Sequence, residues 1–117
     1  MAYESSVVLR CGEEMFAELK ELFEKGKALK PSSIRKGIYY YLSWENISWK
    51  EKYPEIEEIM KIVKSAFIEK KDFYFIRSGD NFDDVEEWGV SQSYDVDEIY
   101  IRKAICIPEE NLEVVKL

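Results

Sequence analysis

The sequence predicts an α+β fold: an antiparallel or mixed sheet of about four strands, with two helices packed on one face. Two segments with helical periodicity alternate with segments of strand-like alternation, in the order strand, helix, strand, helix, strand, strand. Because the last two strands are joined without a helix, we expect them to run antiparallel. The chain has 117 residues, a length that predicts a single domain over residues 1–117.

Apolar residues recur three and four positions apart in two segments, which is the spacing of an amphipathic helix. We predict the first helix over Gly12–Lys25, with acidic residues in its first turn and Gly26 as a favourable stop. The second helix begins at Pro54, whose missing N–H costs nothing in a first turn. The two predicted core stripes are Met15, Phe16, Leu19, Leu22 and Phe23, and Ile56, Ile59, Met60, Val63, Ala66 and Phe67.

Four segments carry strand patterns: Tyr3–Arg10, Gly37–Asn46, Asp72–Arg77 and Asp97–Ile107. An extra short strand at Val85–Trp88 is a further expectation. The segment 37–46 alternates most regularly, which predicts a central strand. Its two faces carry Ile38, Tyr40, Leu42 and Trp44 on one side, and Tyr39, Tyr41, Ser43 and Glu45 on the other.

Two further segments are predicted to be irregular. Lys27–Lys36 is a basic connection, which is interpreted either as a solvated loop or as a contact with an acidic partner or a phosphate. Residues 109–117 are predicted to form a loose tail, although Leu112, Val114 and Val115 could dock on the domain.

The chain is acidic, with a net charge of −7 from 24 acidic and 17 basic residues. This balance argues against binding to nucleic acids or anionic membranes, because both require a basic face. No apolar run approaches the ~20 residues of a membrane span, and the first residues lack a secretion signal. We therefore expect a cytoplasmic protein in which Cys11 and Cys106 are reduced, with a disulfide between them as the alternative.

Acidic residues gather between Ser78 and Ile101, a segment without Lys or Arg. Three interpretations stay open: solvated charge, a surface that attracts a basic partner, and a divalent-cation site built on Asp80, Asp84 and Glu86. The spacing does not match a calcium loop, because Phe82 stands where an oxygen ligand belongs. The acids of this segment are Asp80, Asp83, Asp84, Glu86, Glu87, Asp95, Asp97 and Glu98.

Aromatic side chains are the other candidates for partner contact. Trp49 and Trp88 are proposed as contact residues because tryptophan is enriched at interface hot spots. Tyr39 and Tyr41 lie on the second face of their strand, where they meet a partner or pack against cross-strand neighbours. Trp44, on the alternating strand, is expected in the core.

Catalysis finds no support in the sequence. There are no histidines, so neither cysteine has its usual activating base, and no phosphate-binding, dinucleotide-binding or zinc motif is present. We predict a protein that is not an enzyme and needs no cofactor.

Two segments share a local pattern with a known group of proteins. Ser48–Ile56 carries a Trp followed by Tyr-Pro-Glu at a helix start, and Phe73–Glu86 carries Ile-Arg-x-Gly followed by acids. Over about residues 38–107 this pattern resembles small uncharacterised proteins of bacteriophages and prophages. The chain departs from it at Lys50, Asp80 and Asn81, where the family carries Tyr, Glu and Asp.

The resemblance implies no activity, only an accessory role during infection of a bacterial host, with action against host defences as a candidate. Together with the charge, it predicts a cytoplasmic protein that binds a host or phage protein with a basic surface. The alternative is a small module or enzyme that binds a divalent metal through the carboxylates between Asp80 and Glu86.

Overall fold

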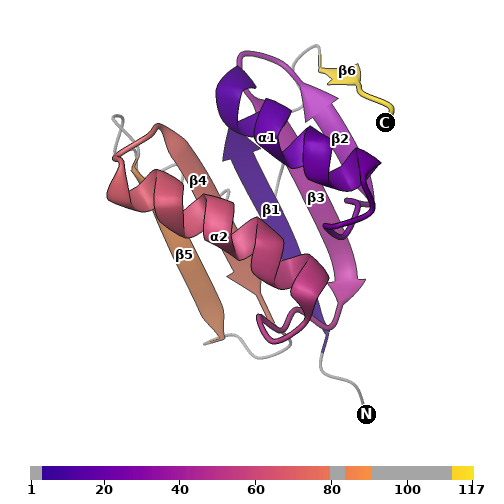
Figure 1. The fold of residues 1–117 in the computed structure, drawn as a ribbon, viewed down its shortest axis with the longest axis vertical. Helices are drawn as coiled ribbons and strands as arrows, with labels where there is room; N and C mark the ends of the chain where they lie inside the picture. Colours follow the sequence, from indigo (N-terminus) through magenta and orange to yellow (C-terminus); the bar gives the residue numbers. More distant parts are fainter. Residues whose placement is uncertain (1–3, 80–83, 91–111) are drawn as a thin grey trace.

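A computed structural model describes residues 4–79, 84–90 and 112–117. The strands form one antiparallel sheet in the order β5-β4-β1-β3-β2-β6. Both helices lie on one face of this sheet (Figure 1). In chain order the elements are β1 (Ser5–Cys11), α1 (Glu13–Glu24), β2 (Ser33–Lys36), β3 (Tyr40–Ile47), α2 (Pro54–Ile68), β4 (Phe73–Ser78), β5 (Val85–Val90) and β6 (Glu113–Val114).

The predicted α+β class is confirmed, but the prediction of about four strands is too low. The described residues form six strands, of which β2 and β6 are the shortest, with four and two residues. β6 lies in the segment expected to be a loose tail, and β2 lies in the segment expected to be a basic loop. The predicted strand Asp97–Ile107 and its pairing lie outside the described residues, as does Cys106.

The core lies between the sheet and the two helices. Alternate residues of β1 are buried, because successive side chains of a strand point to opposite faces. Leu9 is fully buried between its neighbours across the ladder, Leu42 on β3 and Phe75 on β4. β1 and β3 are therefore the two central strands of the described sheet, so the prediction of a central strand within 37–46 is confirmed.

The helices bury the predicted stripes almost without exception. Met15, Phe16, Leu19 and Phe23 of α1 are buried, as are Ile56, Ile59, Met60, Val63 and Ala66 of α2. Leu22 is half-buried and packs against the core. Phe67, at the end of the second stripe, is instead 42% exposed. Gly26 follows α1 with a φ of +71°, a conformation that favours glycine over residues with a β-carbon.

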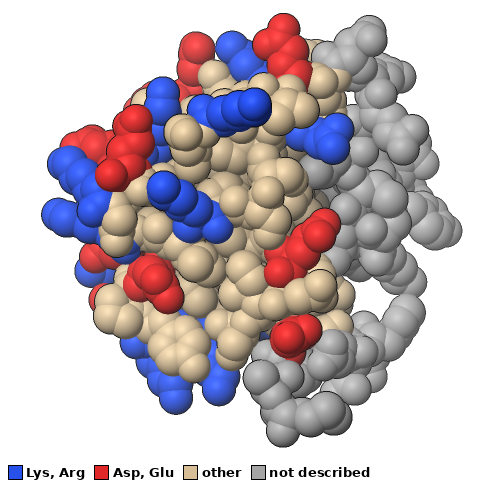
Figure 2. Space-filling view, turned by 90° about the vertical axis from the view of Figure 1, so that its right-hand side faces the viewer, with Lys and Arg blue, Asp and Glu red and all other residues tan. Residues whose placement is uncertain are grey.

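The turn between β2 and β3 differs from the prediction. β3 begins at Tyr40, so Ile38 lies in the turn and is 95% exposed rather than inward-facing. Tyr40 keeps its predicted side and stacks on Phe16 of α1, with ring centroids 3.9 Å apart. Viewed from the side on which β6 lies, acidic and basic side chains are interspersed on the surface (Figure 2).

Candidate functional site

The β4–β5 hairpin carries the described part of the predicted acidic surface. Arg77 lies opposite Glu86 and Phe75 opposite Trp88 across the two strands. Since Phe75 is buried under the helices, Glu86 and Trp88 lie on the helix-covered face as well. Glu87, between them, points to the other face. The hairpin therefore divides these neighbouring acids between two faces of the sheet.

Arg77 holds the acidic side chains of the hairpin. Its Nη2 and Nη1 atoms lie 2.9 Å and 3.2 Å from the two oxygens of Asp84, and its Nε lies 3.3 Å from Glu86 Oε1. Nη1 also donates to Ser5 Oγ at 3.3 Å. The planar guanidinium donates two hydrogen bonds to one carboxylate. A lysine cannot reproduce this bidentate contact. Although the segment from Ser78 to Ile101 contains no Lys or Arg, Asp84 and Glu86 thus contact a basic side chain that directly precedes it.

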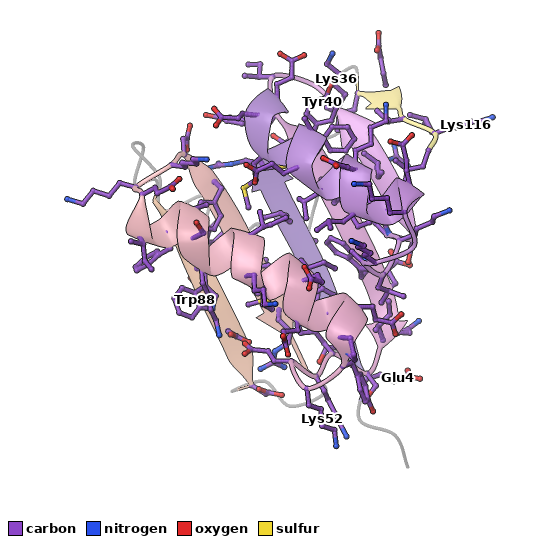
Figure 3. All side chains as sticks on the ribbon, viewed as in Figure 1. Glu4, Lys36, Tyr40, Lys52, Trp88 and Lys116 are labelled. Atoms are coloured by element: carbon purple, nitrogen blue, oxygen red, sulfur yellow. The ribbon has the colours of Figure 1, made fainter. Side chains whose placement is uncertain are left out.

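Trp88 is half-buried beside α2, where Figure 3 shows it projecting from β5. Its indole N–H donates to Glu86 Oε2 at 2.9 Å, which fixes the ring in orientation. The ring of Phe67 meets it edge to face, with centroids 5.3 Å apart, and Lys64 Nζ lies 5.8 Å from its centroid. We call Phe67, Asp84, Glu86 and Trp88 the β5 surface.

The β5 surface presents two carboxylates, those of Asp84 and Glu86, and both contact the guanidinium of Arg77. On the other face, Glu87 accepts a hydrogen bond from the Tyr74 hydroxyl at 2.9 Å. The remaining acids of the predicted segment, Asp80, Asp83, Asp95, Asp97 and Glu98, lie outside the described residues.

Tyr39 and Tyr41 are not brought to this surface. They belong to the β3 side of the sheet, and β4 and β1 lie between β3 and β5. The Tyr39 hydroxyl donates to Asp72 at 2.6 Å, and the Arg10 guanidinium lies 4.7 Å from its ring centroid. The hydrogen bond to Asp72 raises the pKa of Tyr39. Tyr41 lies opposite Arg10. Tyr39 is thus packed against cross-strand neighbours.

Trp49 belongs to the core, which corrects its assignment as a contact residue. It is 8% exposed, and its ring lies 5.3 Å from that of Trp44 and 6.0 Å from that of Phe75. Trp44 is fully buried and donates its indole N–H to the Leu29 carbonyl at 2.9 Å, as expected of a core residue.

Among the described residues, the carboxylates predicted to bind a metal do not form a metal site. Within the described ranges, no group of three His, Cys, Asp or Glu side chains is placed to hold a metal ion. Asp84 and Glu86 contact Arg77, so a divalent cation would have to compete with a guanidinium for them. Asp80 lies outside the described residues.

Cys11 is a free, fully buried thiol. Burial raises its pKa to about 12, so the reactive thiolate is scarce at neutral pH.

Phe67 and Arg77 are the residues of this site that the sequence prediction missed. Arg77 lies near the end of β4, directly before Ser78-Gly79. Because β5 pairs antiparallel with β4 after this point, residues at the start of β5 lie opposite the Arg77 side chain. Phe67 is the last aromatic of the α2 stripe, one residue before the helix ends. Both positions are recognisable once the hairpin and the end of the helix are known.

Comparison of the chain with models of protein families, with curated proteins and with solved structures finds no match. Neither helix in the described ranges has both the length and the apolar composition needed to span a membrane.

Proposed function

We propose that this protein acts by binding another protein through the β5 surface, and that it catalyses no reaction. The observation that carries the proposal is the aromatic pair of Phe67 and Trp88, flanked by the carboxylates of Asp84 and Glu86. Phe67 is 42% exposed although it belongs to the apolar stripe of α2. Aromatic side chains are enriched at the centre of protein interfaces, and polar side chains surround them at the rim.

The charges around this pair favour a partner with a basic surface. Asp84 and Glu86 share one guanidinium, and the whole chain has a net charge of −7. An attractive field of this sign increases the rate at which a basic protein associates. The resemblance to phage and prophage proteins supports an accessory role in the cytoplasm of a bacterial host, against a host or phage protein of this kind.

The proposal is tested by capturing partners from a bacterial lysate with the native chain and with two variants. Phe67→Ala removes the exposed ring of the β5 surface and leaves Arg77 and its carboxylates unchanged. Ile38→Ala is the matched control, because Ile38 is 95% exposed but lies in the β2–β3 turn. An aromatic residue at an interface hot spot contributes a large share of the binding free energy. Phe67→Ala should therefore raise the dissociation constant of a true partner roughly thirtyfold.

The salt dependence of the same interaction tests the sign of the partner's charge. The affinity of a partner held by carboxylates falls as ionic strength rises, because salt screens exposed charges. A partner that binds the Phe67→Ala variant as tightly as the native chain, or whose affinity does not fall with salt, would contradict the proposal.

A further inference from the structure

The edge of the sheet opposite β5 is closed by a short segment of the same chain. β6 runs antiparallel to β2, with Val114 opposite Arg35 and Glu113 opposite Lys36. The ladder continues for one more bond, in which Val115 N–H donates to the Ile34 carbonyl at 2.9 Å. This segment lies at the outer edge of the sheet, next to β2 (Figure 1).

Two apolar side chains of this segment, Leu112 and Val115, rest on the domain. A β-carbon on Gly37 would lie 2.5 Å from Leu112 Cδ2, so the missing side chain of Gly37 makes the space that Leu112 uses. Val115 is half-buried and packs against the core. Between them Glu113 and Val114 are exposed, Val114 by 68%. The edge of β2 therefore accepts an extended segment with apolar residues three positions apart.

The same contacts are weak enough to be exchanged. The regular pairing covers two residues of β6, and a single backbone hydrogen bond continues it. Segments held by few buried apolar contacts open more readily than the core strands. A segment tethered to its own site competes at an effective concentration of about millimolar, which a partner segment can match.

We propose that the outer edge of β2 is a binding site for an extended segment of another protein, in which a leucine is followed three residues later by a valine. β6 occupies this site in the unbound chain. The partner strand adds to β2 by backbone hydrogen bonds, as in other cases of strand addition to an exposed edge, with the space at Gly37 and the core next to Ile34 selecting its side chains. This site is separate from the β5 surface and does not depend on it.

The test uses the full chain with Leu112→Asp and Val115→Asp, which removes both apolar contacts of the tethered segment. The probe is a fluorescent peptide with the sequence of residues 111–117. We expect the variant to bind this peptide at least tenfold more tightly than the native chain does, because the native site is occupied. The same peptide carrying the two aspartates is the matched control and should not bind.

Gly37→Val, added to the double variant, tests where the peptide binds. Gly37 is exposed, so a larger side chain fills the leucine space without entering the core, and peptide affinity should fall at least fivefold. Equal affinity of the native chain and the folded double variant, or an unchanged affinity after Gly37→Val, would overturn the proposal.

Hydrogen exchange on the native chain decides the matter if the double variant does not fold. Millimolar peptide should at least double the exchange rate of the Val115 amide, while the amides of the central strand β1 stay unchanged. Unchanged exchange at Val115 would equally overturn the proposal.

Discussion

One guanidinium, that of Arg77 on β4, contacts both β1 and the start of β5. It contacts Ser5 at the start of β1, Asp84 before β5 and Glu86 on β5. The Arg77 side chain is 16% exposed and the two carboxylates about twice that, so water screens these pairs less than it screens a surface pair. Removing the guanidinium takes its positive charge away from two partly desolvated carboxylates.

We therefore expect Arg77→Met to lower the free energy of unfolding by about 2 kcal/mol. Urea denaturation followed by fluorescence measures this change. In a background with Asp84→Asn and Glu86→Gln, the same substitution should cost at least about 1 kcal/mol less, since the partners are already neutral. An equal cost in both backgrounds would show that the ion pairs contribute nothing.

The thiol of Cys11 makes stability depend on pH above neutrality. Burial raises its pKa from 9.0 to about 12. Between these values the unfolded chain holds fewer protons than the folded chain, so stability falls as pH rises. We expect the native chain to lose roughly 1 kcal/mol more than Cys11→Ala between about pH 8 and about pH 10. Parallel stability profiles of the two proteins, measured by urea denaturation, would contradict this.

At the scale of elements, the sequence predicts the helices and strands whose apolar residues recur at a regular spacing and whose ends are marked by particular residues. α2 begins at Pro54 as expected, and the alternation of Tyr40, Leu42 and Trp44 predicts the inward face of β3, although the strand begins three residues later than predicted. β2 and β6 were missed because each is short and has exposed residues, so no apolar period marks it. Their pairing is decided by contacts distant in sequence, such as that of Val115 with Ile34, which a local pattern does not contain.

The close approach of β5 to β4 depends on Gly89, which lies opposite Tyr74. A β-carbon on Gly89 would lie 2.6 Å from the Phe73 carbonyl oxygen, a backbone atom that cannot turn away. Gly89→Ala should therefore shift β5, lower the free energy of unfolding by about 1–3 kcal/mol and alter the fluorescence of Trp88.

Gly12→Ser is the matched control for this glycine substitution. Gly12 precedes α1 as its N-cap and has open space around it, so a serine there should leave stability unchanged or raise it. Equal losses of stability for the two variants would show that the close approach at Gly89 is not the cause.

At the scale of the whole molecule, the candidate site was predictable in composition but not in placement. Trp49 and Trp88 both have charged neighbours in the sequence, yet Trp49 packs between Trp44 and Phe75 in the core. Its burial depends on contacts with residues distant in the sequence, which a local pattern does not contain. Likewise, the acids form a run in sequence, but the pleat of β5 separates Glu86 from Glu87.

The same placement bears on whether the protein binds divalent cations. Asp84 and Glu86 are engaged by Arg77, and the described residues hold no other group of carboxylates suited to a metal. A bound ion stabilises the folded state by an amount that grows with its concentration, to roughly 3 kcal/mol at a hundred times its dissociation constant. The chain has 24 acidic residues, so the screening of their charges by any salt also changes stability. Each thermal melt with a divalent salt is therefore compared with one in NaCl at equal ionic strength.

We expect millimolar Ca²⁺, Mg²⁺ or Mn²⁺ to shift the melting temperature no more than that control. A specific rise of several degrees, abolished by Asp84→Asn, would instead favour a metal-binding module and contradict the assignment of these carboxylates to partner contact.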